Sequence, residues 1–270
     1  MLRLSLIGSA AVALLALSHS GVEACGPDTD CVIGERTYRI ALPEGDGPFG
    51  AIVYLHGWRG TAAGVMNNGA MREMAADLKV ALVAAKSGGE DWLIRNAPRK
   101  GFVHDRRETA YFDALVDEIT TKFPIDGERL LATGFSAGGM MTWTLACRMP
   151  ERFAGFLPVA GTFWAPLPDD CGFGDAPLIH IHGTSDTVVP LNGRPIADTR
   201  QGEVSLALAA LRARGAGEPQ AQALAPPEPL RCDGAAAPGG VWQAQCLHDG
   251  GHVIRPEWLA FGYRALVAGQ

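Results

Sequence analysis

Residues Leu130 to Gly139 read Leu-Leu-Ala-Thr-Gly-Phe-Ser-Ala-Gly-Gly, and an apolar helical pattern runs over Ala137–Arg148. The first four residues have the apolar character of a short buried strand. A Gly-x-Ser-x-Gly segment between a strand and a helix is typical of a nucleophile elbow, a sharp turn that exposes a serine hydroxyl at the edge of a sheet. Glycines flank the serine because side chains there would collide with the adjoining strand and helix. The segment therefore predicts Ser136 as a nucleophile, and a plain glycine-rich turn is the alternative.

Strands and helices are predicted to alternate on both sides of this segment. Short or period-two apolar runs indicate strands, and apolar residues at three- and four-residue spacing indicate helices. The strands are expected at Thr37–Leu42, Ala51–Leu55, Val80–Ala85, Leu130–Thr133, Gly155–Ala160, Leu178–His182 and Val241–Leu247. The helices are expected at Val65–Lys79, Glu108–Phe123, Ala137–Arg148, Val204–Arg214 and Glu257–Ala268. This alternation predicts an α/β fold with a mostly parallel central sheet and helices on both faces, whose ligands bind at the carboxyl ends of the strands.

A serine hydroxyl is a weak nucleophile unless a base accepts its proton and a third group orients that base. Asp186 follows the strand Leu178–His182, at the same edge of the sheet as Ser136, and is the expected acid. Asp175 and Asp249 are alternative acids, and Asp186 would then only cap a turn.

The expected base is His252, on the loop after the strand Val241–Leu247, because the two preceding glycines allow a flexible approach to the serine. His248 is the alternative base and lies nearer the end of the strand. His180 and His182 lie within a buried central strand, where hydrogen-bonded core histidines are expected. The resulting chain order, serine then aspartate then histidine, is that of the α/β-hydrolase fold.

Acyl transfer also needs two hydrogen-bond donors aimed at the developing oxyanion. The backbone amide of Ala137, directly after the nucleophile, is one candidate. The strand Ala51–Leu55 leads into residues 56–60, which read His-Gly-Trp-Arg-Gly and resemble an esterase oxyanion loop. The amide of Trp58 is therefore the expected second donor, with that of Gly57 as the alternative and a simple strand-ending turn as the other interpretation.

The composition predicts one globular unit. Hydrophobic residues make up 47% of the 270 residues and charged residues 19%, and no linker or repeat divides residues 25–270. Acidic residues number 29 and basic residues 23, for a net charge of −6. Because no basic run is present to follow a phosphate backbone, nucleic acid is not an expected partner.

Residues 1–24 differ in composition from the rest of the chain. Arg3 precedes an apolar run over Leu4–Leu17, and Val22-Glu23-Ala24 fits a small-x-small cleavage signal, so we expect a signal peptide. The protein would then be secreted, to the outside of the cell or to the periplasm. An N-terminal anchor is the alternative, but the run is shorter than the roughly 20 residues that span a bilayer, and stable membrane insertion is not expected. Lipidation at Cys25 is a further alternative.

If the protein is exported, its six cysteines are expected to form disulfides, because disulfides persist in oxidising compartments. Spacing along the chain and position relative to the predicted elements favour Cys25–Cys31, Cys147–Cys171 and Cys232–Cys246. No two cysteines have the Cys-x-x-Cys spacing of a zinc site. We therefore expect neither a metal nor another cofactor.

Three segments resemble the signature blocks of the group of poly(3-hydroxybutyrate) depolymerases and feruloyl esterases. They are Gly134 to Met140, His182 to Pro190, and Gly250-Gly251-His252, and the resemblance extends from Cys31 to the C-terminus. It implies a secreted carboxylic ester hydrolase that works through Ser136, Asp186, His252 and an acyl-enzyme. The family often continues with Thr-Trp-Pro-Gly after its Gly-Gly-His, whereas residues 253–256 read Val-Ile-Arg-Pro, a departure at one aromatic wall of the acyl pocket.

The expected substrate is a small or oligomeric ester, including fragments of a polyester or of an esterified plant polysaccharide. Trp58, Trp92 and Trp164 follow predicted strands at the carboxyl edge and are candidates to line an aromatic cleft. Residues 161–171 are too short and proline-rich for a helical lid, so we expect an open site without a lid domain, in a monomer. The alternative functions are a serine peptidase on the same fold and a secreted binding module that has lost the chemistry.

Overall fold

The computed structural model describes residues 25–98, 105–173, 177–213, 224–236 and 242–268. The expected leader, residues 1–24, and the alternative acid Asp175 lie outside the described residues.

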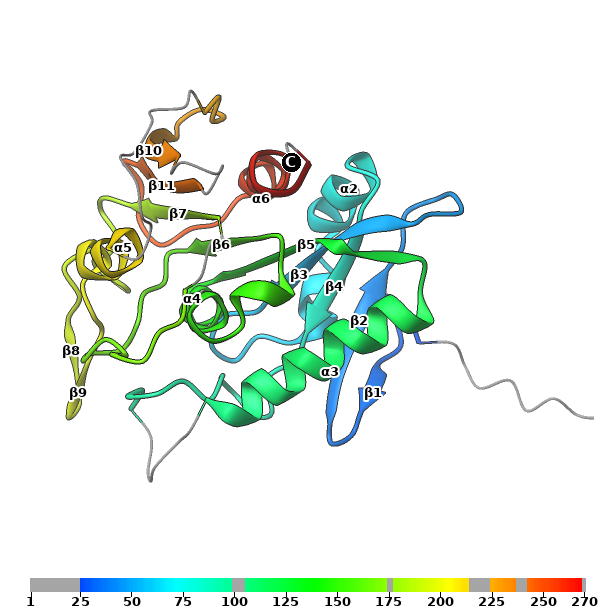
Figure 1. Cartoon of the computed structure of the whole chain (residues 1–270), viewed down its shortest axis with the longest axis horizontal. Coiled ribbons are helices and arrows are strands. Elements are labelled where there is room, and N and C mark those ends of the chain that lie inside the picture. The colour runs from blue at the N-terminus through cyan, green and yellow to red at the C-terminus, as the bar shows by residue number, and fades with distance from the viewer. Residues whose placement is uncertain (1–24, 99–104, 174–176, 214–223, 237–241, 269–270) are drawn as a thin grey trace, which may run out of the picture.

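A nine-stranded sheet forms the centre of the molecule, in the order β1-β2-β4-β3-β5-β6-β7-β11-β10 (Figure 1). The strands from β4 to β11 in this order are mutually parallel, and the outer strands pair antiparallel. The strands are β1 Cys31–Ile33, β2 Arg36–Ala41, β3 Phe49–Leu55, β4 Ala81–Ala85, β5 Ile125–Phe135, β6 Gly155–Val159, β7 Leu178–Gly183, β10 Arg231–Ala236 and β11 Trp242–His248. A separate hairpin pairs β8 (Pro195–Ile196) with β9 (Thr199–Arg200).

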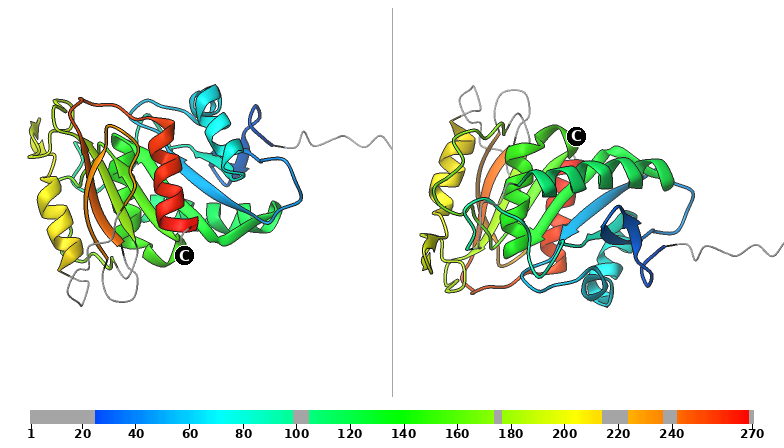
Figure 2. Two further views of the ribbon diagram at one scale, coloured as in Figure 1. Left: turned by 90° about the horizontal axis from the view of Figure 1, so that it is seen from above. Right: turned by 90° about the horizontal axis from the view of Figure 1, so that it is seen from below.

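Helices cover both faces of the sheet, as Figure 2 shows from above and below. One face carries α1 (Ala62–Met66), α2 (Gly69–Asp77) and α6 (Pro256–Tyr263), which a π-helical turn extends over Arg264–Ala268. The other face carries α3 (Arg106–Lys122), α4 (Ala137–Arg148) and α5 (Val204–Arg212), and a 3-10 turn follows α4 at Pro150–Arg152. The prediction of an α/β fold with a mostly parallel sheet is confirmed.

Two apolar layers hold this architecture together. Because side chains alternate between the faces of a strand, β3 buries Ala51, Val53 and Leu55 beneath α3 and α4. Ile52 and Tyr54 of the same strand point to the opposite layer, beneath α1, α2 and α6. Both faces of the central strands are therefore buried, which explains their continuous rather than alternating apolar sequence.

The predicted helix Val65–Lys79 is two helices in the structure. Asn68 caps α2 by accepting a hydrogen bond from the amide of Met71 at 3.3 Å, and the chain turns between α1 and α2. Asparagine side chains stabilise a helix start in this way, and the cap competes with the continuous apolar periodicity. Sequence periodicity also missed the short edge strand β1, the edge strand β10 and the β8–β9 hairpin.

The structure contains the three expected disulfides, Cys25–Cys31, Cys147–Cys171 and Cys232–Cys246. Cys232 and Cys246 face each other across the β10–β11 pair.

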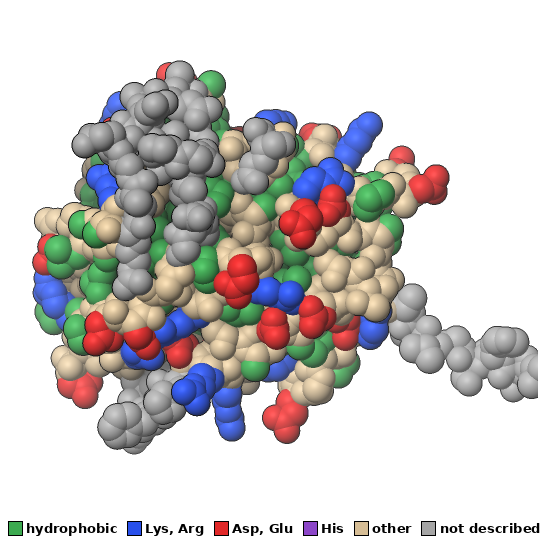
Figure 3. Space-filling view, viewed as in Figure 1, with side chains coloured by type: hydrophobic (Ala, Val, Ile, Leu, Met, Phe, Trp, Pro, Cys, Tyr) green, Lys and Arg blue, Asp and Glu red, His purple; other side chains and the backbone are tan. Residues whose placement is uncertain are grey.

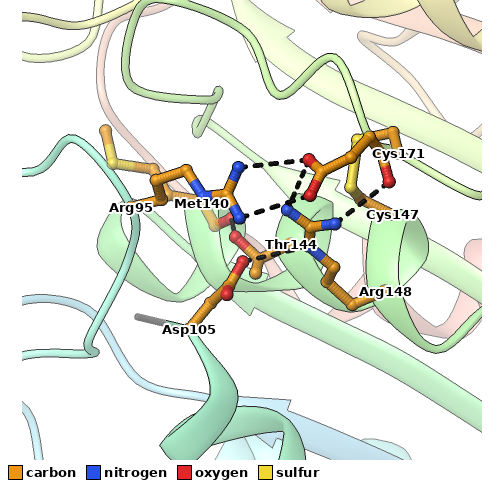
Figure 4. The surroundings of a disulfide bond; sticks show 8 residues. Arg95, Asp105, Met140, Thr144, Cys147, Arg148 and Cys171 are labelled. Carbon is orange, nitrogen blue, oxygen red and sulfur yellow. Dashed lines mark hydrogen bonds and ion pairs between the residues drawn. A yellow bond between two sulfur atoms is a disulfide. The ribbon is translucent and has the colours of Figure 1, made fainter. Parts of the chain in front are cut away.

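The disulfide between Cys147 and Cys171 ties the loop after β6 to the end of α4. Figure 4 shows that Arg148 lies beside it, with the carboxylate of Asp105 directed at its guanidinium. Arg148 Nε is 3.0 Å from Asp105 Oδ2, and its Nη2 is 2.8 Å from Asp170 Oδ1. The disulfide and the ion pair between Arg148 and Asp170 therefore hold the loop that leaves the carboxyl edge of β6.

Acidic and basic side chains are interspersed on the face drawn in Figure 3. Within the described ranges, no helix has the length and apolar character needed to cross a bilayer. The described residues between β6 and β7 contain no helix either.

Candidate active site

Ser136 occupies the sharp turn between β5 and α4. Its backbone has φ 58° and ψ −119°, in the left-handed half of conformational space that a residue with a side chain rarely adopts. Its amide donates to the carbonyl of Val159 at 3.0 Å, which extends the pairing of β5 with β6. Such a strained conformation persists only where the surroundings over-determine it, and it occurs often at functional sites.

The glycines of this segment allow backbones to approach each other. A Cβ atom on Gly138 would lie 1.9 Å from the carbonyl oxygen of Leu55, and one on Gly134 would lie 2.6 Å from the backbone of Gly138. A Cβ atom on Gly139 would lie 2.5 Å from the carbonyl oxygen of Val159. Since backbone atoms cannot give way cheaply, glycine is required at all these positions. The elbow therefore packs directly between β3 and β6.

Asp186 and His252 meet at the same edge of the sheet. His252 Nδ1 lies 2.7 Å from Asp186 Oδ2, and the aspartate side chain is fully buried while 15% of the histidine side chain is exposed. The other carboxylate oxygen accepts the amides of Val188 and Val189 at 2.8 and 2.9 Å. These amides fix the carboxylate so that one oxygen is directed at the imidazole.

Backbone hydrogen bonds join the two loops that carry this pair. The amide of Thr184 donates to the carbonyl of His248 at 2.8 Å, and that of Ser185 donates to Gly250 at 3.1 Å. A Cβ atom on Gly183 would lie 2.3 Å from the carbonyl oxygen of Gly250. The loops after β7 and β11 can therefore approach this closely only because Gly183 has no side chain.

The imidazole of His252 packs beside the elbow. Its ring centroid is 4.5 Å from that of Phe135, the residue before Ser136. The structure thus brings the three residues expected to act together to one place, on loops that follow β5, β7 and β11.

The alternative assignments have other contacts. Asp249 is exposed and pairs with Arg231, not with a histidine. His248 is buried, its Nδ1 accepts the amide of Gly250 at 3.1 Å, and its ring packs against that of Trp258. Both side chains are thus engaged away from the Asp186–His252 contact.

His56 fixes the loop after β3. Its Nε2 accepts the amide of Ser87 at 3.1 Å, so the proton of the neutral ring is on Nδ1, which donates to the carbonyl of Gly57 at 2.7 Å. Burial lowers the pKa of His56 to about 4. The backbone carbonyl of His56 accepts the indole N–H of Trp92 at 2.8 Å. Sequence reasoning identified the His-Gly pair but gave His56 no such role.

This loop lies against the elbow. A Cβ atom on Gly57 would lie 3.6 Å from the Cβ of Ser136. Ala137 is the first residue of α4, where backbone amides have no acceptor within their own helix. The loop that carries Gly57 and Trp58 therefore lies beside Ser136, and Ala137 follows the serine at the start of α4.

Only one of the three candidate tryptophans is on the surface. Trp58 is 61% exposed, and the guanidinium of Arg59 lies 4.4 Å from the centre of its ring. Trp92 is completely buried, and its indole N–H donates to the carbonyl of His56. Trp164 is 8% exposed. The expectation that Trp92 and Trp164 line a cleft is corrected, because the chain after β4 and β6 folds back into the core.

A pocket of about 210 Å³ opens beside the loop after β3. It lies between this loop, the helices α1 and α2, and the segment that follows His252. Residues from these sources and from the end of β3 line it, among them Tyr54, Gly57, Asn68, Met71, Ile254 and Pro256. The pocket thus adjoins the candidate oxyanion loop.

Comparison with known proteins gives consistent relatives. The sequence model of the phospholipase/carboxylesterase family matches residues 104–200. The chain is 32% identical over 165 residues to a protein named as an esterase, NocK, of Nocardia uniformis, a match covering 58% of this chain and 47% of that protein. It is 29% identical over 168 residues to feruloyl esterase C of Emericella nidulans, covering 60% of this chain and 58% of the relative. The chain spans about half the length of the curated relatives it matches.

Among solved structures, the chain is similar to the acetyl xylan esterase from Aspergillus awamori. The TM-score is 0.54 at 14% sequence identity, and the match covers 88% of this chain and 96% of that one. At this identity the likeness concerns the fold alone. The chain thus has the α/β-hydrolase fold, and over somewhat more than half of its length its sequence is similar to those of esterases.

Proposed function

We propose that the protein is a serine carboxylic ester hydrolase whose catalytic triad is Ser136, His252 and Asp186. The observation that carries the proposal is the 2.7 Å contact between Asp186 and His252, formed beside a serine held at φ 58°. A carboxylate that accepts from Nδ1 leaves Nε2 of a neutral histidine as the base. Sequence similarity to esterases supports the same chemistry.

In the proposed reaction the Ser136 hydroxyl attacks the ester carbonyl while His252 takes its proton. The tetrahedral intermediate collapses, the bond to the alcohol breaks, and His252 returns the proton to the leaving alkoxide. Water then attacks the acyl-enzyme with the same assistance, which releases the acid and restores the serine. Asp186 stabilises the imidazolium formed in each half-reaction.

The developing oxyanion is proposed to accept hydrogen bonds from the amides of Ala137 and Trp58, with Gly57 as the alternative to Trp58. Two features of the fold support this. Ala137 opens helix α4, and His56 holds the other loop rigidly through both ring nitrogens. Donors that are already in place cost no reorganisation in the transition state.

For the substrate we propose short-chain, hydroxyacyl or aromatic acyl esters in solution, including oligomers of a polyester or esters of a plant polysaccharide. A pocket of about 210 Å³ suits a compact acyl or alcohol group, and the exposed indole of Trp58 offers a surface for an adjoining part. No helix lies in the described part of the β6–β7 connection, which supports an open site.

We also propose that the protein is exported, to the outside of the cell or to the periplasm. The composition of residues 1–24 and the three disulfides support export, because disulfides persist in oxidising compartments.

A panel of p-nitrophenyl esters of increasing acyl length and the matching p-nitroanilides tests the proposed function. We expect hydrolysis of the esters but not the anilides, with rates that fall as the acyl chain lengthens and no jump at the solubility limit. Ser136→Ala is the control and should abolish turnover while the protein stays folded. Preference for the anilides would indicate a peptidase, no turnover of either would indicate a binding module, and a rate jump at the solubility limit would indicate a lid.

A further inference from the structure

Two histidines of β7 are fully buried behind the candidate acid. His180 and His182 lie two residues apart on one strand and so share a face of the sheet, and neither is exposed to solvent. His180 Nε2 is 2.9 Å from His182 Nδ1. Burying polar imidazoles is unfavourable unless they are hydrogen-bonded. Their bonding pattern is therefore informative.

The hydrogen-bond partners of the two rings determine which ring nitrogens carry protons. His182 Nε2 lies 2.7 Å from the carbonyl oxygen of Val189, which can only accept, so Nε2 carries a proton. Burial lowers the pKa of both imidazoles, so each is neutral near pH 7 and His182 Nδ1 has a free lone pair. His180 Nε2 therefore donates to His182 Nδ1. The other tautomer of His180 would direct two lone pairs at each other.

This chain of donors ends on the turn that carries Asp186. Val189, whose carbonyl accepts from His182, also donates its amide to Asp186 Oδ1 at 2.9 Å. His182 Nε2 faces Asp186 Oδ2 at 3.5 Å, and this is the oxygen that His252 Nδ1 contacts at 2.7 Å. The proton on His182 Nε2 thus lies where the turn, the carboxylate and β7 converge.

We propose that His182 is a positioning residue for the pair of Asp186 and His252, and that His180 supports the tautomer which this role requires by donating to Nδ1 of His182. The inference rests on the catalytic function proposed above for that pair. By bonding Val189, His182 holds the turn 186–189 against β7, so the carboxylate oxygen that orients His252 keeps its place through both half-reactions.

The contacts of the His180 ring are consistent with this role. His180 Nδ1 is buried without a hydrogen-bond partner among the described residues, and so is Nε1 of the neighbouring Trp143. The hydrogen bond to His182 is thus the one side-chain hydrogen bond that His180 makes within the described part of the chain. An apolar residue at position 180 would leave Nδ1 of His182 buried without a donor, which would weaken the preference for the tautomer protonated at Nε2.

The test compares three replacements of His182 by steady-state kinetics on a p-nitrophenyl ester. His182→Leu removes the donor, His182→Gln can place an amide N–H near the position of Nε2, and His182→Asn is too short to do so. For His182→Leu we expect kcat to fall about 10- to 100-fold with KM changed less than about threefold, because a displacement of about 1 Å can have that effect. His182→Gln should recover most of the loss, and His182→Asn should not.

Tyr38→Phe is the matched control. Tyr38 is also fully buried in the sheet, and its hydroxyl donates to Glu118 at 3.0 Å on the far side of the molecule. This variant should lose stability without losing kcat. If His182→Leu does not fold, the comparison of the Gln and Asn variants still decides whether the donor matters.

Proton NMR supplies a readout that does not depend on turnover. The low-field signal of the His252 Nδ1 proton should weaken or shift in His182→Leu and remain in His182→Gln and Tyr38→Phe. A folded His182→Leu protein with kcat within about twofold of the parent and an unchanged signal overturns the inference. Equal losses in the Gln and Asn variants would also overturn it. Full activity of Ser136→Ala would instead overturn the proposed function, so the two failures are distinguishable.

Discussion

His56 and His252 both lie on loops at the carboxyl edge of the sheet, yet their surroundings differ. His56 is 2% exposed and both of its ring nitrogens bond to backbone groups, whereas His252 is partly exposed and has Nδ1 on a buried carboxylate. A histidine bonded only to neutral backbone groups gains nothing from a second proton. One bonded to a carboxylate is stabilised when it becomes charged.

The comparison teaches that the neighbours of a histidine, more than its position at the active edge, determine what it can do. The neutral ring of His56 braces the loop that carries the candidate oxyanion donors. In the proposed mechanism the ring of His252 accepts and returns a proton while Asp186 compensates its charge.

Replacing His252 should have the largest effect and is the strongest test of this comparison. His252→Ala removes the base and should lower kcat by about 10⁴-fold or more, because triad members act as a unit. The free energy of unfolding should fall as well, because Asp186 is left buried without its partner. Steady-state kinetics and urea denaturation measure both quantities. A large loss of stability with little loss of kcat would reverse the roles assigned to the two histidines.

Asp186→Asn tests whether His252 needs the carboxylate in order to act as the base. An amide at this position can donate to the ring and so favours the wrong tautomer, and we expect kcat to fall about 10³- to 10⁴-fold. Asp249→Asn is the matched control at an exposed carboxylate that pairs with Arg231. It should keep the activity of the parent, and a severe loss there would revive Asp249 as the acid.

The dependence of the free energy of unfolding on acidic pH tests the part of the comparison that concerns His56. Its folded pKa is about 4, lowered by burial from 6.5. Between these values the unfolded chain binds a proton that the folded protein does not, so the free energy of unfolding falls as the pH falls through this window, by on the order of 3 kcal/mol.

Urea denaturation at pH 7 and pH 4.5 measures this loss in the parent and in His56→Leu. His180 and His182 contribute in the same direction, so the difference between the two proteins isolates His56. The variant should be less stable at pH 7 and should lose less stability on acidification. Equal losses in both proteins would mean that His56 is not held neutral.

Trp58→Ala should have the smallest effect. It removes the exposed indole but keeps the backbone amide, so we expect KM to rise about three- to tenfold with kcat nearly unchanged, as for the loss of a contact made equally in ground and transition states. The control is Leu206→Ala, which removes a different exposed apolar side chain, on α5. A large fall in kcat would mean that the ring, not the amide, acts in catalysis.

Local chemistry made much of the fold and of the site predictable from the sequence. The elbow was visible because close backbone contacts at Gly134 and Gly138 demand glycine, and that requirement appears in the sequence whatever the rest of the fold does. Asp186 and His252 were identified because parallel strands end at one edge of the sheet.

Features set by tertiary packing were not predictable. Trp92 follows a strand at the active edge, as Trp58 does, but its indole turns inward to the carbonyl of His56. The apolar spacing of residues 65–79 fits one helix, and only the cap at Asn68 divides it. The bond between His180 and His182 depends on ring orientation, which a two-residue spacing does not reveal.

Covalent labelling tests the central claim most directly. The protein would be treated with a fluorophosphonate, and the modified residue would be identified by intact-mass measurement and peptide mapping. The account predicts one adduct, on the peptide that contains Ser136, formed much more slowly in His252→Ala and absent in Ser136→Ala. Labelling of a different residue, or no labelling of the folded parent protein, would contradict it.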